Sequence, residues 1–197
     1  FQAEDGIRDC LLSRGLGDVY KRQLINIMKK NLNFIIAFLT LLFVGCNNPS
    51  EKHLELEAAQ ASLESNLEMY TMVWNEVFKN KNLDIINEEY FDKDVVAVAT
   101  SAGDVVGLEN FKAYYGNYIT GFSDGELIFV DLFGQGDKMV KHWRFKGTHD
   151  GDFFGVPPTN KTVDVSGTTL IKMKDGKIVA EQDFMDFLSF YTQLGLM

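Results

Sequence analysis

Two carboxylates close to the C-terminal end, Glu181 and Asp183, are the side chains of this sequence best suited to chemistry. They stand two residues apart, which places both on one face of a β-strand because strand side chains alternate. A carboxylate in an apolar, water-poor pocket has a raised pKa, which suits it to removing a proton from carbon and returning it later. The sequence therefore predicts an acid–base site with Asp183 and Glu181 as catalytic residues. The alternative is a structural role, in which Asp183 hydrogen-bonds a neighbouring backbone and fixes the last strand.

His149 is the third predicted catalytic residue and the only histidine placed to take part. His53 lies near the N-terminal linker, and His142 alternates with Trp143, which we expect to face inward. His149 begins a loop rich in glycine and proline. Two interpretations stay open: its imidazole is a general base, or it anchors this tightly shaped loop through a hydrogen bond. The shape of the loop favours the anchor.

Residues that usually bind metals and cofactors are scarce in this chain. The three histidines are scattered, and Cys10 and Cys46 both precede the predicted domain. No glycine-rich loop follows a predicted strand in the way that a phosphate-binding loop does. We therefore expect no cofactor and no metal ion.

Aromatic side chains are numerous enough to line a cavity as well as to fill a core. An apolar cavity with a few polar groups is the default ligand site, and a planar apolar molecule would fit aromatic walls. The predicted pocket residues are Trp74, Phe78, Tyr115, Trp143, Phe145, Thr169 and Ile171. Phe153 and Phe154 would either cover this pocket as a lid or bury against a second copy of the chain in a homodimer.

The spacing of apolar residues predicts helices first and strands afterwards. Helical spacing extends over 54–79, over a short segment at 83–87 and onward from Gly107. The predicted strands are 95–99, 127–133, 139–146, 162–173 and 177–183. This order predicts an α+β fold in which N-terminal helices pack on a curved, mainly antiparallel sheet.

The face on which Asp183 lies depends on the turn before the last strand. The residues that share the predicted inner face of 162–173 are Val163, Val165, Gly167, Thr169, Ile171 and Met173. A two-residue turn at Asp175-Gly176 would put Gln182 on this face and Asp183 on the outer one. A three-residue turn over 174–176, with Gly176 left-handed, reverses the faces. It places Val179, Glu181 and Asp183 on the inner side with Thr169.

The C-terminal half contains a series of motifs that resembles a known family. They are WRFKGTHDG at 143–151, GVPPT at 155–159, DGKI at 175–178, Asp183, and QLG at 193–195. Their order resembles the SnoaL-like polyketide cyclase, or ester cyclase, branch of the nuclear transport factor 2-like superfamily, over about residues 67–196. The resemblance implies a cone-shaped, cystatin-like fold around one apolar pocket. It also places the family's acid–base aspartate at Asp183, which favours the three-residue turn.

One position departs from the family pattern. The cyclases carry a histidine six residues before the Asp-Gly turn, where this chain has Thr169. Threonine donates a hydrogen bond but takes up no proton at neutral pH. Two functions therefore stay open. One is a cofactor-independent cyclase, isomerase or lyase that uses Asp183 on a hydrophobic carbonyl compound, and the other is a non-catalytic domain that binds a small hydrophobic molecule.

The N-terminal segment resembles the export signal of a bacterial lipoprotein. Lysines at 29–30 precede an apolar run over 34–44, and Gly45-Cys46 ends it. We expect a signal peptide at 28–45, lipidation of Cys46, a linker over 46–53 and the SnoaL-like domain over 54–197. Such a protein is anchored in the bacterial cell envelope, on the periplasmic or the cell-surface side. The alternative is an uncleaved membrane anchor.

Residues 1–27 fit neither the signal nor the domain. They resemble translated adaptor sequence, so we expect a non-native leader, and a genuine cytoplasmic tail is the alternative. The whole chain has a formal net charge of −9, and the segment over 1–45 holds more basic than acidic residues, so the remainder is more acidic still. An acidic surface repels phosphate backbones, and we therefore expect no binding of nucleic acid.

Overall fold

The computed structural model describes residues 51–100 and 103–197. Residues Glu55–Met197 form one compact unit. The predicted leader, the signal peptide and Cys46 lie outside the described residues. The last three residues of the predicted linker, 51–53, are helical. In the described part of the chain, no helix is both long enough and apolar enough to cross a membrane.

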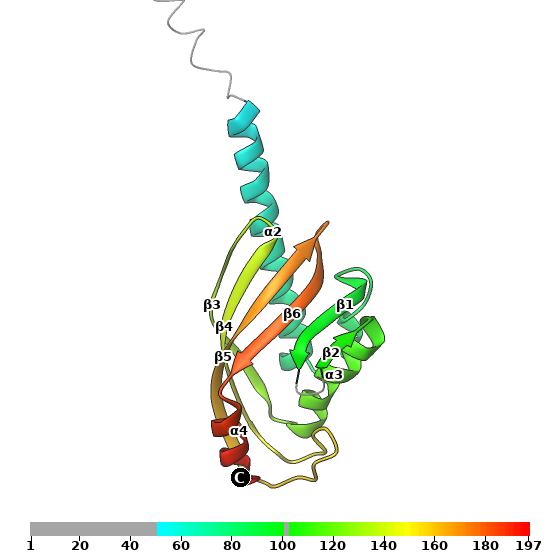
Figure 1. The fold of residues 1–197 in the computed structure, drawn as a ribbon, viewed down its shortest axis with the longest axis vertical. Helices are drawn as coiled ribbons and strands as arrows, with labels where there is room; N and C mark the ends of the chain where they lie inside the picture. The colour runs from blue at the N-terminus through cyan, green and yellow to red at the C-terminus, as the bar shows by residue number, and fades with distance from the viewer. Residues whose placement is uncertain (1–50, 101–102) are drawn as a thin grey trace, which may run out of the picture. The chain divides into compact units, whose positions relative to one another are not determined.

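Helices pack on a six-stranded mixed sheet, which confirms the predicted α+β class (Figure 1). The elements are α2 (Glu51–Lys79), η1 (Leu83–Ile85), β1 (Phe91–Thr100), β2 (Gly103–Val106), α3 (Leu108–Gly121), β3 (Glu126–Gln135), β4 (Lys138–Thr148), β5 (Thr162–Lys174), β6 (Lys177–Met185) and α4 (Phe187–Leu194). The strand order is β2-β1-β6-β5-β4-β3. Neighbouring strands are antiparallel except β1 and β6, which are parallel.

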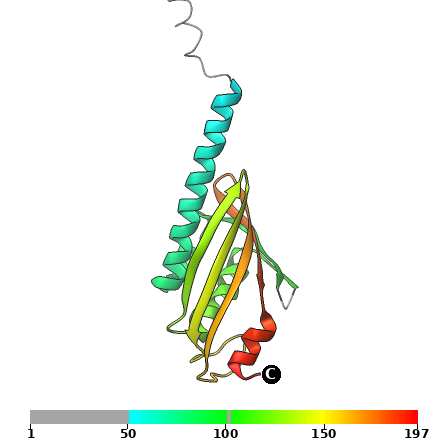
Figure 2. The same cartoon turned by 90° about the vertical axis from the view of Figure 1, so that its left-hand side faces the viewer.

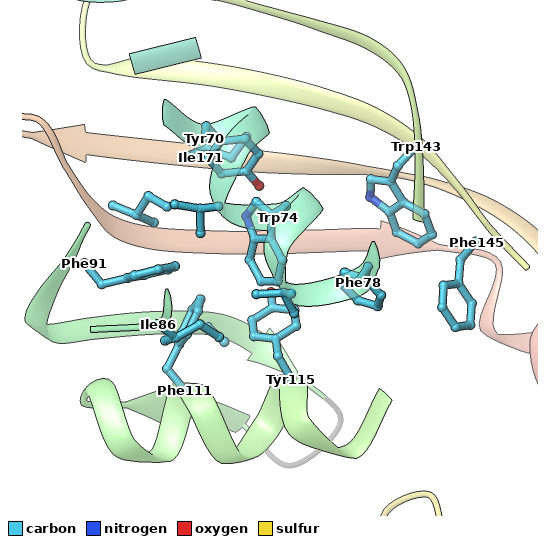
Figure 3. Packing of buried hydrophobic residues seen from close by; sticks show 14 of the residues in the cluster. Tyr70, Trp74, Phe78, Ile86, Phe91, Phe111, Tyr115, Trp143, Phe145 and Ile171 are labelled. Atoms are coloured by element: carbon cyan, nitrogen blue, oxygen red, sulfur yellow. The ribbon is translucent and has the colours of Figure 1, made fainter. Parts of the chain in front are cut away.

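Helices α2 and α3 each bury one face, and these faces meet. The buried residues of α2 within the core recur at helical spacings: Leu63, Tyr70, Val73, Trp74, Val77 and Phe78. On α3 the corresponding residues are Phe111 and Tyr115, four positions apart. The rings of Trp74 and Tyr115 pack edge to face with centroids 4.6 Å apart (Figure 3). Figure 2 shows β3, β4 and β5 with α3 behind them.

The inner face of the sheet follows the predicted alternation. On β5 the buried residues are Val163, Val165, Thr169, Ile171 and Met173, as expected. On β4 they are Met139, Lys141, Trp143 and Phe145. Gly167 belongs to the same row and pairs with Trp143 on β4. A Cβ atom at this position would stand 2.3 Å from the Trp143 ring. Glycine at this position therefore lets the indole of Trp143 lie across β5.

The hairpin between β5 and β6 reaches the predicted register by a different route. Both Asp175 and Gly176 have positive φ, at 51° and 75°, which is the two-residue type I′ turn. The expected three-residue turn is therefore wrong. A bulge at Val179 supplies the extra residue instead, because Met173 pairs with Ile178 and Lys172 pairs with Ala180.

Beyond this bulge the two acids take the expected face. Ile171 stands opposite Glu181, and Thr169 stands opposite Asp183. Val179, which we expected on the inner face, is only partly buried, and Ile178 is fully buried in its place. One inserted residue thus reverses the faces that the short turn alone would have given.

Two elements have no counterpart in the predictions. Strand β2 is an edge strand of four residues, too short for a clear alternation. Helix α4 begins at the cap Asp186, whose side chain accepts a hydrogen bond from the Ser189 backbone, and ends at Gly195 with φ of 72°. It buries Phe190 and Leu194.

Deleting Val179 should leave both acids in place, because the strand would then continue with Ala180 opposite Lys172 without a bulge. Deleting Gln182 is the matched control, since Asp183 would then take an outward position. The chain has two tryptophans, and each indole gives its own N–H resonance in a ¹H–¹⁵N NMR spectrum. The Trp74 resonance reports the surroundings of Glu181, and the Trp143 resonance reports those of Thr169 and Asp183.

We expect the Val179 deletion to keep both indole resonances near their native positions, at a cost to unfolding free energy within the roughly 3 kcal/mol usual for single changes. The Gln182 deletion should shift the Trp143 resonance. A Val179 deletion that displaces both signals, with the Gln182 deletion leaving them unchanged, would contradict the proposed register.

Candidate active site

A hollow lies between the inner face of the sheet and the two helices. About 50 Å³ of it is open to the centre of a water-sized sphere. The lining residues are Trp74, Phe78, Ala97, Val98, Thr100, Tyr114, Tyr115, Tyr118, Leu127, Lys141, Trp143, Phe145, Val165, Glu181, Asp183, Met185, Phe187 and Phe190. This volume exceeds the roughly 10–15 Å³ that one water molecule needs.

Most of the predicted pocket residues line this hollow, and two lie behind its wall. Trp74, Phe78, Tyr115, Trp143 and Phe145 are lining residues. Thr169 and Ile171 are buried in the sheet and are not among the lining residues.

Glu181 is the more deeply buried of the two predicted acids. Its side chain is 1% exposed, and it accepts a hydrogen bond from the Trp74 indole at 3.0 Å. The hydroxyl of Tyr115 lies 3.2 Å from its other oxygen. Glu181 is therefore held by one residue from α2 and one from α3.

Asp183 shares the Tyr115 hydroxyl, which lies 3.0 Å from its Oδ2 atom. Its other oxygen, Oδ1, accepts a hydrogen bond from the Thr169 hydroxyl. That hydroxyl in turn accepts one from the Trp143 indole at 2.9 Å. Because an indole N–H can only donate, the Thr169 proton is directed to Asp183. The residue at the family's histidine position therefore orients this carboxylate.

Burial raises the pKa of Glu181 to about 7. The positive charge of Lys141 opposes this rise, and the negative charge of Asp183 adds to it. Glu181 is consequently a group that gains and loses a proton near neutral pH. Burial also raises the pKa of Tyr115 well above its usual value, so its hydroxyl stays protonated there.

The contacts of Tyr115 lead to the same conclusion about Glu181. One phenolic proton lies between two carboxyl groups, and it can form one strong hydrogen bond at a time. A proton on one carboxyl group would make both contacts favourable, since that group could donate to the phenolic oxygen. Glu181, with its pKa near 7, is the residue that holds this proton.

Lys141 is the residue of this site that sequence reasoning missed. Its side chain is 3% exposed and lines the hollow. Its ammonium lies over the rings of Trp74, Tyr70 and Phe129, at 4.8, 5.2 and 5.5 Å from their centroids. Burial lowers the pKa of Lys141, and the charges of Glu181 and Asp183 oppose that shift. Its position in the apolar alternation of 139–145 was the signal that could have identified it.

The structure separates His149 from the two acids. Its side chain is fully buried and does not line the hollow; its ring packs on those of Phe122 and Phe153, at 5.4 and 6.1 Å between centroids. Its Nδ1 atom accepts a hydrogen bond from the Thr159 backbone at 3.2 Å. Its own backbone exchanges hydrogen bonds with Lys161 and Asn160 across the loop. These contacts match the loop anchor and not the general base.

The two loop phenylalanines have different surroundings. Phe153 is buried against Phe122 and Phe190, whereas Phe154 is 46% exposed and packs on Tyr114. A homodimer through this loop stays a prediction. Among the described residues, no group of histidine, cysteine and acidic side chains could hold a metal ion.

Comparisons with known proteins agree with this fold. The family model of the SnoaL-like polyketide cyclase matches residues 67–194. No curated protein matches the chain. A putative SnoaL-like polyketide cyclase from Jannaschia sp. CCS1 is similar in structure, with a TM-score of 0.62 and 26% identity over 68% of this chain and 94% of that one.

Two further solved structures share the fold. TsrD from Streptomyces laurentii has a TM-score of 0.58 and 22% identity over 70% of this chain and 97% of its own. A putative polyketide cyclase from Acidithiobacillus ferrooxidans has a TM-score of 0.57 and 23% identity, over 67% and 95%. With the motifs, the sheet and the family model all in agreement, the chain belongs to the SnoaL-like polyketide cyclase family.

Proposed function

We propose that this domain is a cofactor-independent acid–base enzyme that removes a proton next to the carbonyl group of a small hydrophobic compound. The observation that carries the proposal is Asp183, a carboxylate on the wall of an aromatic hollow, oriented at both oxygens by Thr169 and Tyr115. Each of these oxygens keeps a second lone pair with which it could accept a proton. The hollow's other walls supply an apolar surface for the carbon skeleton.

The second acid gives the proton a place to go. Asp183, the Tyr115 hydroxyl and Glu181 form a continuous series of contacts at 3.0 and 3.2 Å. While Glu181 is in its ionised form, a proton taken up by Asp183 can pass through Tyr115 to Glu181 and return by the same route. Since the pKa of Glu181 is about 7, little free energy is needed for this group to hold or release it.

The chemistry proposed is narrower than that of an aldol cyclase. Closing a ring by aldol addition needs a proton delivered to the new alkoxide as well as one removed from carbon. Thr169 cannot act as an independent acid, so a single proton would serve both steps through Asp183 and Glu181. Two reactions fit these residues best. One is an isomerisation, and the other is a ring closure in which the proton removed from carbon is later delivered to the product.

We also propose that Cys46 carries a lipid and anchors the protein in the bacterial cell envelope. Three features of the sequence support this: the two lysines at 29–30, the apolar run over 34–44, and the glycine immediately before the cysteine. A single acyl chain gives weak anchoring, so stable attachment would need more than one chain.

Replacing the cysteine tests the anchor. In a bacterial host fed a radiolabelled fatty acid, the wild-type chain should take up label and sediment with membranes. Cys46→Ser should lose both properties, and Cys10→Ser, the control, should keep them. Label and membrane association that persist in Cys46→Ser would contradict lipidation at this residue.

Replacing the proposed base tests the enzymatic function. A series of apolar ketones such as 2-tetralone would be incubated in D₂O, with deuterium uptake at the carbon next to the carbonyl followed by NMR. Asp183→Asn should lower the protein-catalysed rate by about 10²–10⁴-fold, the usual contribution of a general base. Asp164→Asn, which changes an exposed acid on the outer face of β5, is the control.

An Asp183→Asn variant that exchanges as fast as the wild type would contradict the role of this carboxylate. Ketones that bind to the wild-type protein without any exchange above buffer would favour the non-catalytic binding function, which the threonine at position 169 also suits.

Glu181 should make stability depend on pH. Its folded-state pKa of about 7 lies above the ordinary value of 4.5, so its contribution is fully present below about pH 4.5 and is lost as pH rises through 7. Glu181→Gln keeps a neutral side chain throughout. Between pH 4.5 and 8 the wild type should lose about 3 kcal/mol of unfolding free energy relative to this variant.

Urea denaturation at both pH values measures this difference, with the exposed Glu88→Gln as the control. If the unfolding free energies of Glu181→Gln and the wild type change by the same amount between pH 4.5 and pH 8, Glu181 does not titrate with a raised pKa.

A further inference from the structure

Lys141 is a buried cation in the same row of the sheet as Asp183. It pairs with Thr169 across β4 and β5, and Thr169 pairs with Asp183 across β5 and β6. The ammonium group, the hydroxyl and the carboxylate therefore belong to one row across three strands. Since adjacent strands lie about 4.8 Å apart, the backbones of Lys141 and Asp183 are roughly 10 Å from each other. The hollow borders both side chains.

The surroundings of Lys141 only partly offset the cost of burying its charge. An ammonium group is expensive to bury unless it is paired with an anion. Lys141 is in none of the ion pairs within 4.0 Å that the described residues form with one another, such as those of Lys93, Lys112 and Arg144. Three aromatic rings contact the ammonium instead. Such contacts favour a cation but provide no negative charge.

A charge balance shows what this cation could do in the reaction. In the proposed reaction the wall starts with Lys141 as a cation and Asp183 as an anion, and Glu181, with its pKa of about 7, can hold or release a proton near neutral pH. When the carbon–hydrogen bond of a ligand breaks, the proton goes to Asp183. The electron pair forms a carbon–carbon double bond, and the carbonyl π electrons move to the oxygen as an enolate.

We propose that Lys141 is a further catalytic residue, whose ammonium group stabilises the negative charge that develops on the carbonyl oxygen of the ligand. The inference rests on the proposed function, in which Asp183 removes the proton. Lys141 and Asp183 carry opposite charges before the step, and Lys141 and the enolate carry them after it, so no net charge is created in the hollow. A fixed cation in a water-poor site stabilises such a charge more than it would in water.

The positions of Lys141 on β4 and Asp183 on β6 narrow the class of ligand. The ligand is an apolar compound whose carbonyl oxygen can reach β4 while its acidic carbon faces β6. Stable anions of the same shape, such as phenolates and naphtholates, should bind to the site as mimics of the enolate. They should do so once Asp183 is neutral, because its negative charge otherwise repels them.

The test uses Asp183→Asn as the background, since asparagine resembles the aspartic acid that exists after proton transfer. The probes are phenol and 2-naphthol, whose neutral and anionic forms differ in absorbance and fluorescence. Lys141→Met and Lys141→Arg are then added to this background. Lys138→Met removes an exposed charge from the same strand and is the matched control. Thermal unfolding and the two indole resonances verify that each variant is folded.

In Asp183→Asn the bound 2-naphthol should favour its anion at least tenfold more than free 2-naphthol does. Adding Lys141→Met should abolish this preference, Lys141→Arg should retain part of it, and Lys138→Met should leave it unchanged. The proposal is overturned if the preference for the anion survives Lys141→Met. It is also overturned if folded Asp183→Asn binds the anion of neither phenol nor 2-naphthol.

These outcomes are distinct from failure of the proposed function. The probe measurement involves no proton removal by Asp183, so it can succeed even where the ketone exchange fails. Ketone exchange that depends on Asp183 but is unchanged by Lys141→Met would overturn the role of Lys141 alone.

Discussion

The register of β6 is the constraint on which the rest of the site depends. A two-residue turn at Asp175-Gly176 would by itself direct Asp183 to the outer face of the sheet. The single extra residue at Val179 reverses the faces, so that Glu181 and Asp183 follow the buried side of β5. Every contact of the two acids, from the indole of Trp74 to the hydroxyl of Thr169, requires this reversal.

The second feature is that each acid is held by groups from distant parts of the chain. The series of hydrogen bonds connects Trp143, Thr169, Asp183, Tyr115, Glu181 and Trp74. The indole at each end can only donate, so the Thr169 hydroxyl oxygen and one oxygen of Glu181 are acceptors, whereas the Tyr115 proton can go to either acid. Burial is the main cause of the raised pKa of Glu181. The positive charge of Lys141 on β4 opposes that rise, and the negative charge of the partly buried Asp183 adds to it.

Much of this arrangement could be predicted from residue types and spacing. The inner face of β5 follows from strict alternation, and the helical faces of α2 and α3 follow from spacings of three and four. The pairing of Thr169 with Asp183 was also expected, although for the wrong reason. A type I′ turn and a three-residue turn are both compatible with Asp-Gly, and a bulge adds one residue without any signature in the sequence.

Other features could not be read because they arise from tertiary contacts. His149 has the residue type of a base, and its burial among Phe122 and Phe153, away from the two acids, is a tertiary contact that residue spacing does not reveal. Lys141 was missed because alternation arguments treat a lysine as a surface residue, whereas aromatic rings from α2 and β3 enclose it here. The short β2 and α4 lacked the length that gives a clear pattern.

A titration of the Glu181 carboxyl carbon by ¹³C NMR measures directly how this acid is buried. If β6 turns this acid into a water-poor interior beside Asp183, its resonance should change with a midpoint near pH 7. A midpoint near 4.5, the ordinary value for glutamate, would show that the carboxyl group faces water and would contradict a buried, acid-paired Glu181.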